Sequence, residues 1–132
     1  MAIYLKYGDI DGDVTEPAYR TYIELMSVQF GQGRPTHSSD SPQASPNVSE
    51  IVVTKETDSA SARLASESVA GQGVPAIIDF VRDDGSVSLR LKMSGTMISS
   101  YQLSGSGDNP TESLTLNFTG MEYKNAPGTP AP

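Results

Sequence analysis

The feature that most constrains this chain is a period of two in its apolar residues. It is clearest from Val87 to Met93, where every second side chain is apolar and the residues between are polar. This alternation is typical of a strand with one buried and one solvated face. The preceding Asp83-Asp84-Gly85 predicts a tight turn, because glycine adopts positive φ without strain. Residues 74–82 and 86–93 are therefore predicted to form a β-hairpin.

The same alternation predicts further strands on both sides of this hairpin. In the segment 19–30 the inward apolar set changes from odd numbers, as at Ile23, to even numbers, as at Val28. A change of phase inside one strand predicts a β-bulge, here near Met26. The other predicted strands are 3–7, 51–57 (with Ile51, Val53 and Lys55 on one side), 96–103, 114–118, and a last one after Gly120 that turns Met121 and Tyr123 inward.

One segment has a helical rather than a strand period. Residues 60–70 are predicted to form an α-helix whose narrow apolar stripe, including Leu64, lies against a sheet. Asp58 or Ser59 is placed to cap its start, and Gly71 follows its end as the C′ residue. The chain is therefore predicted to be all-β with one short α-helix, folded as an antiparallel β-barrel or sandwich.

Residues 31–49 break the strand pattern, with three Pro, two Gly and five Ser and only Ala44 and Val48 as apolar members. Such a composition cannot form a core, so the segment is predicted to be a long exposed loop. Loops of this length in compact domains usually serve binding. We expect one domain over residues 1–126 and a flexible Pro-rich tail at 127–132.

The charge and the composition exclude several classes of function. The 132 residues carry a formal net charge of −7 and no Cys. An acidic chain lacks the basic footprint of a nucleic-acid binder and is repelled by anionic membranes. No segment approaches the roughly 20 apolar residues of a membrane span, and the start lacks a basic region followed by an apolar one. We expect synthesis in the cytoplasm, no membrane insertion, and export, if any, without a signal peptide.

Three acidic residues have a spacing that invites a metal interpretation. Asp9, Asp11 and Asp13 match the first three ligands of a calcium-binding EF-hand loop. That loop requires Gly at its sixth position and Glu at its twelfth, where this chain has Val14 and Arg20. The three aspartates are therefore predicted to form a solvated turn.

Two other motifs contain residues typical of catalysis or phosphate binding. His37, Ser38 and Asp40 are the residue types of a nucleophilic triad, but such triads join residues from different rigid elements. The segment 105–108, Gly-Ser-Gly-Asp, is too short for a phosphate loop, lacks the following Lys and leads into a strand. We therefore predict no catalytic residue, no metal and no cofactor, and a protein that is not an enzyme.

Several motifs, in order along the chain, resemble one known family. They are the turn from Tyr7 to Gly12, the pair of strands IELMSVQFG (23–31) and IVVTK (51–55) around a polar loop, the helix at 58–71, and TESLTLNF (111–118). Together they resemble the Hcp family (haemolysin co-regulated protein), the tube subunits of the bacterial type VI secretion system. The resemblance implies a β-barrel with one flanking helix that assembles into hexameric rings.

The resemblance also implies a function and partners. Rings of this family stack into a tube that a sheath ejects, with effector proteins carried in the lumen. The implied partners are other copies of the chain and the sheath, tip and effector proteins, and the protein leaves the cell through the machine itself. The family's long loop contacts the neighbouring ring. By position it is the segment 31–49 here, with the candidate contact residues Gln32, Arg34, Pro35, His37, Ser41 and Pro46.

The alternation also predicts which side chains line such a lumen. Because Val28 and Phe30 face the core, Ser27 and Gln29 face the opposite side and are the predicted lumen residues. Two alternatives stay open at this point. One is a tail-tube-like subunit of a related contractile injection device, and the other is a small all-β ligand-binding module.

Overall fold

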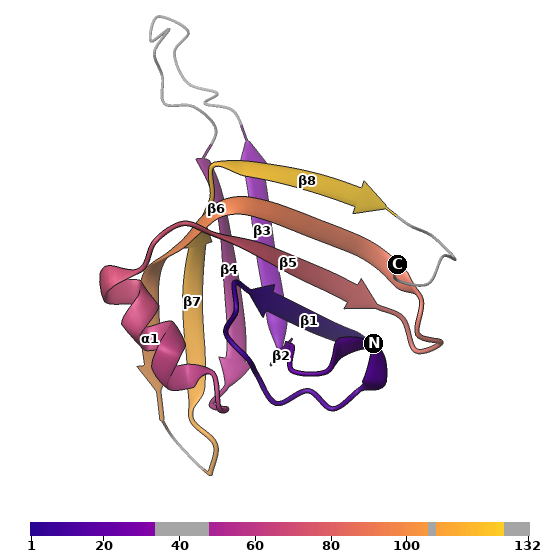
Figure 1. Cartoon of the computed structure of the whole chain (residues 1–132), viewed down its shortest axis with the longest axis horizontal. Coiled ribbons are helices and arrows are strands. Elements are labelled where there is room, and N and C mark those ends of the chain that lie inside the picture. The colour runs from indigo at the N-terminus through magenta and orange to yellow at the C-terminus, as the bar shows by residue number, and fades with distance from the viewer. Residues whose placement is uncertain (34–47, 106–107, 126–132) are drawn as a thin grey trace, which may run out of the picture.

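The computed structural model describes residues 1–33, 48–105 and 108–125 (Figure 1). Within these ranges it has eight β-strands, one α-helix and one short 3-10 helix, η1, which confirms the predicted fold class. In chain order the elements are β1 (Ala2–Tyr7), η1 (Pro17–Tyr19), β2 (Ile23–Leu25), β3 (Ser27–Gly33), β4 (Val48–Glu56), α1 (Ser61–Ala70), β5 (Val74–Val81), β6 (Val87–Ser104), β7 (Thr111–Asn117) and β8 (Gly120–Asn125).

The strands form two antiparallel layers that share one long strand. Their order is β2-β1-β5-β6-β7-β4-β3, and β8 also pairs with β6. The first half of β6 lies between β5 and β8, whereas its second half pairs with β7. Among the described strands, β2, β3 and β8 each pair on one side only, so the sheet is open at these edges. The fold is thus a barrel-like sandwich that is not closed by hydrogen bonds.

The shared strand β6 is longer than the sequence predicted, because the expected strands 86–93 and 96–103 are continuous. The bend between its halves lies at Gly95, which has φ +61°, and a Cβ there would come within 2.3 Å of the Thr119 hydroxyl. The pairing with β5 slips at the same place, from Ala76 opposite Met93 to Val74 opposite Thr96. Glycine therefore allows one strand to leave the first sheet and enter the second.

The core fills the space between the two sheets and below α1. Leu5, Ile78, Val53 and Leu116 from four strands are all almost fully buried, as is Leu64 of the helix. Figure 1 shows α1 at one end of the sandwich, beside the second half of β6. Burial of Leu64 anchors this face of the helix, as the apolar stripe predicted.

The predicted change of phase near Met26 is present, but it is a break between two strands and not a bulge within one. The expected strand 19–30 is divided into η1, β2 and β3, and Met26 lies between the two strands. β2 pairs with β1 in one sheet, and β3 pairs with β4 in the other. The backbone N–H of Met26 donates to the Thr54 carbonyl at 2.7 Å. The phase changes because the chain moves from one sheet to the other.

The predicted loop 31–49 is too long at both ends. Gly31, Gln32 and Gly33 belong to β3, paired with Glu50, Ser49 and Val48 of β4. The sequence pattern did not predict these strand ends, because their residues are polar or glycine. They belong to strands because backbone pairing does not require an apolar side chain. The rest of the predicted loop lies outside the described residues.

Two smaller predictions also need correction. The helix begins at Ser61, and Gly71 has φ −76°, so it is not a left-handed C′ residue. Met121 packs against the core as predicted, but the Tyr123 side chain is 59% exposed. Tyr123 lies on the edge strand β8, where it pairs with Leu91 of β6. At this edge an inward-facing side chain is no longer covered by the core.

Candidate functional site

The middle of the outward side of one sheet carries an uncharged, mostly polar surface, which we call the neutral face. Glu50 and Glu56, near the two ends of β4, lie on the same side but outside it. The register places the members of the neutral face in two rows across β3, β4, β7 and β6. The first row is Ser27, Thr54, Ser113 and Gln102, and the second is Gln29, Val52, Thr115 and Ser100. None of these eight residues is charged, although the whole chain has a net charge of −7.

The predicted residues Ser27 and Gln29 both lie on this face and are exposed. Val28 and Phe30, between and after them, pack against the core as the alternation required. The hydroxyls of Ser27 and Thr54 are 2.6 Å apart, so neighbouring strands are joined on the face itself. Among the described elements, α1 packs mainly against β6, and its buried Leu64 belongs to the core on the other side of the sheet, so the helix does not cover this face. Exposure is thus established for both residues, and their place in a lumen stays a prediction.

The outward side of the other sheet is partly covered, over β1 and β5, by the turn that contains η1. Tyr19 stacks on Tyr4 of β1 with ring centroids 4.6 Å apart, and its hydroxyl donates to the Asp79 carboxylate at 2.7 Å. Arg90 binds both oxygens of that buried carboxylate, each at 2.7 Å. Burial and the neighbouring Asp79 raise the pKa of Tyr19, so its hydroxyl stays protonated. The two sheets therefore differ, since one outward side is partly covered by Tyr19 and its turn and the other is open.

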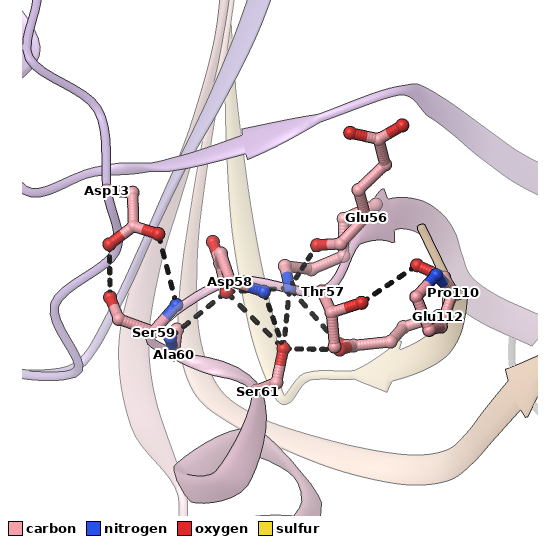
Figure 2. Close-up of polar contacts among 10 residues, drawn as sticks. Asp13, Glu56, Thr57, Asp58, Ser59, Ala60, Ser61, Pro110 and Glu112 are labelled. Carbon is pink, nitrogen blue, oxygen red and sulfur yellow. Dashed lines mark hydrogen bonds and ion pairs between the residues drawn. The ribbon is translucent and has the colours of Figure 1, made fainter. Parts of the chain in front are cut away.

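A buried charge network lies where β4 ends and α1 begins (Figure 2). It consists of Lys55, Asp58, Ser61 and Glu112. The side chains of Lys55 and Glu112 are both 0% exposed, and Lys55 Nζ lies 3.1 Å from Glu112 Oε1 and 2.8 Å from Asp58 Oδ1. Lys55 also donates to the Glu56 carbonyl at 2.9 Å. Buried charges require partners of this kind.

The same network joins three elements at one point. Lys55 comes from β4, Glu112 from β7 and Ser61 from the first turn of α1. The Ser61 hydroxyl donates a hydrogen bond to Glu112 Oε2. Asp58 Oδ1 accepts the backbone N–H of Ala60 at 3.0 Å, which helps to satisfy the free donors of the helix start. The predicted N-cap at Asp58 or Ser59 is therefore wrong, because the N-cap is Ala60, and Asp58 supports the helix start from two residues earlier.

The sequence indicated half of this network. Lys55 is in phase with the buried Ile51 and Val53, so its inward direction was predictable. Glu112 is likewise in phase with the buried Leu114 and Leu116 of β7. Two opposite charges in phase with apolar runs on two strands could have indicated a pair. The register that makes Lys55 and Glu112 neighbours exists only in the folded sheet.

The three aspartates of the predicted turn have three different partners. Asp9 pairs with Arg63 of the helix at 3.1 Å, and Asp11 lies 3.7 Å from Lys6. Asp13 accepts hydrogen bonds from the backbone N–H (3.2 Å) and the hydroxyl of Ser59. Those bonds lower the pKa of Asp13. In the part of the chain that the structure describes, no group of three or more His, Cys, Asp or Glu residues could hold a metal ion.

The remaining sequence candidates are only partly placed. Gln32 is in the backbone ladder of β3, opposite Ser49, and not in a loop. Arg34, Pro35, His37, Ser41 and Pro46 lie outside the described residues, as do Ser38 and Asp40. In the predicted turn at 105–108, positions 106 and 107 also lie outside them. Among the described helices none is long and apolar enough to cross a membrane.

These features define an all-β protein of two antiparallel layers, with one flanking helix, one partly covered outward side and one open neutral side. The family model described as "Type VI secretion system effector, Hcp" matches residues 4–124. The chain therefore belongs to the Hcp family of type VI secretion proteins. A search of curated proteins finds no match.

Solved structures of Hcp proteins have the same fold. Hcp1 from Salmonella typhimurium superposes with a TM-score of 0.85 at 20% identity, covering 97% of this chain and 88% of that one. Hcp1 from E. coli EAEC 042 gives 0.82 at 19% identity, covering 98% and 94%. A structure described as a type six secretion system protein gives 0.78 at 25% identity, covering 92% and 82%. The chain is thus a type VI secretion protein with the Hcp fold.

Proposed function

We propose that six copies of this chain form a ring, that rings stack into an ejected tube, and that effector proteins travel inside it. The observation that carries this proposal is the neutral face. A surface of hydroxyl and amide groups with one aliphatic residue, Val52, and no charge, exposed on a chain of net charge −7, suits a wall that other proteins contact and leave. Charged side chains on such a wall would bind cargo proteins of opposite charge and repel those of like charge.

In this arrangement the neutral face lines the lumen, with Ser27 and Gln29 among its exposed members. The partly covered side and the helix then face outward, toward the sheath. The edge strands β3 and β8 support lateral contact, because each has unpaired backbone groups along its free side. A ring needs heterologous contacts, in which one edge of each copy meets a different edge of the next.

Stacking is assigned to the segment that joins β3 to β4. The candidate contact residues Arg34, Pro35, His37, Ser41 and Pro46 all belong to it, whereas Gln32 belongs to the strand before it. We propose that the domain of residues 1–126 builds the ring, and that this segment meets the neighbouring ring. The sheath, the tip and the effectors are the other proposed partners, and export through the machine needs no signal peptide.

The ring is tested by sedimentation and negative-stain microscopy over a range of concentrations. We expect an annular particle with six times the 14.0 kDa mass of the chain. Replacing residues 34–47 with Asn-Gly should leave rings and abolish stacks, because this two-residue turn can join β3 to β4 directly. A single 14.0 kDa species at every concentration would refute the proposal.

The lumen assignment has its own test. Because the chain has no Cys, a gold–maleimide label on Gln29→Cys marks one position only. The label should appear in the central hole of the ring, whereas the same label on Lys92→Cys, an exposed residue of β6, should appear elsewhere. Gold from Gln29→Cys on the outer rim would overturn the assignment.

A further inference from the structure

The β3–β4 pair has two ends that serve different purposes. At one end Gly33 and Val48 are joined by residues 34–47. At the other end lie Ser27 of β3 and Glu56 of β4, and Figure 1 shows these ends at opposite poles of the sandwich. β3 has seven residues, so the two ends are roughly 20 Å apart. Copies stacked head to tail therefore bring one pole of each copy to the other pole of the next.

The pole opposite Gly33 and Val48 contains a hollow, which we call the polar-end hollow. Its volume is about 370 Å³. It opens between the β2–β3 corner and the end of β4, and both apolar and acidic residues line it. The lining residues are Val14, Leu25 and Met26 with Thr57, and the four carboxylates Asp13, Glu24, Glu56 and Asp58. Met26 is 56% exposed.

The wall of this hollow is held in place by the contacts of Figure 2. Asp13 is bonded to Ser59, and Asp58 is bonded to Lys55 of the buried charge network. Thr57 is tied to the Pro110 carbonyl by both its hydroxyl, at 2.9 Å, and its backbone N–H, at 3.1 Å. The hollow therefore exists before any partner arrives, which lowers the entropy lost on binding.

We propose that the polar-end hollow receives residues 34–47 of a second copy, in the next ring of the stack. This inference rests on the proposed function, and it names the seat of the stacking contact. The segment begins with Arg34 directly after β3 and contains one acid, Asp40. Glu24 and Glu56 have no cationic partner among the described residues, and Arg34 can supply one. Fourteen residues that leave and return to one pole can reach roughly 20 Å.

A disulfide between copies tests the seat directly, because the natural chain has no Cys. The variant carries Thr36→Cys in the segment and Met26→Cys at the hollow. A disulfide needs Cα atoms within about 7 Å, and along the chain all seven residues of β3 separate the two positions. Oxidised rings should give a ladder of dimers, trimers and longer species on a denaturing gel, because each copy joins the next head to tail.

The matched control pairs Thr36→Cys with Leu103→Cys. Leu103 is 60% exposed, close to the 56% of Met26, and lies at the same pole opposite Glu112, outside the hollow. It should give no ladder. Equal ladders from both variants, or none from either while microscopy shows stacks, would overturn the seat and leave the proposed function standing. Absence of rings and stacks from the natural chain would overturn both.

A charge exchange gives a second measurement on the cysteine-free chain. Arg34→Glu should raise the ring concentration at which stacks appear by about tenfold or more, because six copies lose the contact together. Adding Glu56→Arg should restore stacking, and the rings themselves should be unchanged in both variants. Stacking that ignores both substitutions would exclude the Arg34 contact.

Discussion

Replacement of Lys55 by Met tests whether the buried charge network acts as described. The substitution keeps an unbranched side chain and removes the ammonium group, which contacts Glu112 at 3.1 Å and Asp58 at 2.8 Å. Glu112 is 0% exposed, so its carboxylate would remain buried with no cation. Removing one member of such a pair costs about 3–5 kcal/mol. This loss is a large part of the free energy of unfolding of a typical domain, which is about 5–15 kcal/mol.

The second member of the pair gives the decisive comparison. The double variant Lys55→Met/Glu112→Leu removes both charges and leaves apolar side chains under α1. Well-packed apolar replacements of buried ion pairs are often neutral or stabilising. We therefore expect the double variant within about 1 kcal/mol of the natural chain, although each single change is costly. This non-additivity distinguishes a coupled pair from two independent losses.

Urea unfolding followed by circular dichroism, at a chain concentration too low for ring assembly, measures these free energies. Lys92→Met is the matched control, because Lys92 is exposed on β6 and its loss should cost less than about 0.5 kcal/mol. If Lys55→Met were as mild as Lys92→Met, the burial of Lys55 would be refuted. If the double variant were as unstable as the sum of the single ones, the coupling with Glu112 would be refuted.

Three further predictions concern other parts of the fold. Gly95→Ala should destabilise the chain by at least about 1–2 kcal/mol, measured by urea unfolding, because φ is +61° and the new Cβ meets Thr119. Leu64→Ala should cost about 2–5 kcal/mol in the same assay, because Leu64 is 0% exposed. Asp13→Asn should destabilise the chain at pH 7, measured by urea midpoints. The hydrogen bonds from Ser59 lower the pKa of Asp13 below 3.8, so its contribution is present above that value. It disappears as the pH falls through the lowered pKa.

Much of the fold could be predicted from the period of the apolar residues. The hairpin around Gly85 is where the sequence placed it, and Gly85 has φ +91°. Inward side chains such as Leu91 and Val53 are buried as expected, because alternation depends only on the local geometry of a strand. The open position of Ser27 and Gln29 follows from the same rule.

The places where prediction failed share a physical cause. At Met26 and Gly95 the chain changes partners, from one sheet to the other. A bulge, a break and a bend all shift the alternation in the same way, so the sequence cannot distinguish them. The end of β3 at Gly33 was missed because its pairing with β4 uses only backbone groups.

By itself the sequence determined the all-β class, the single helix and the side of each strand that faces the core. It did so because these properties depend on neighbours within a few residues. Only the tertiary structure decided that Lys55 meets Glu112, that Tyr19 partly covers one outward side, and that a hollow lies at the end of the β3–β4 pair away from Gly33 and Val48. Those features join residues that are distant in the chain, and strand register, which no local pattern specifies, brings them together.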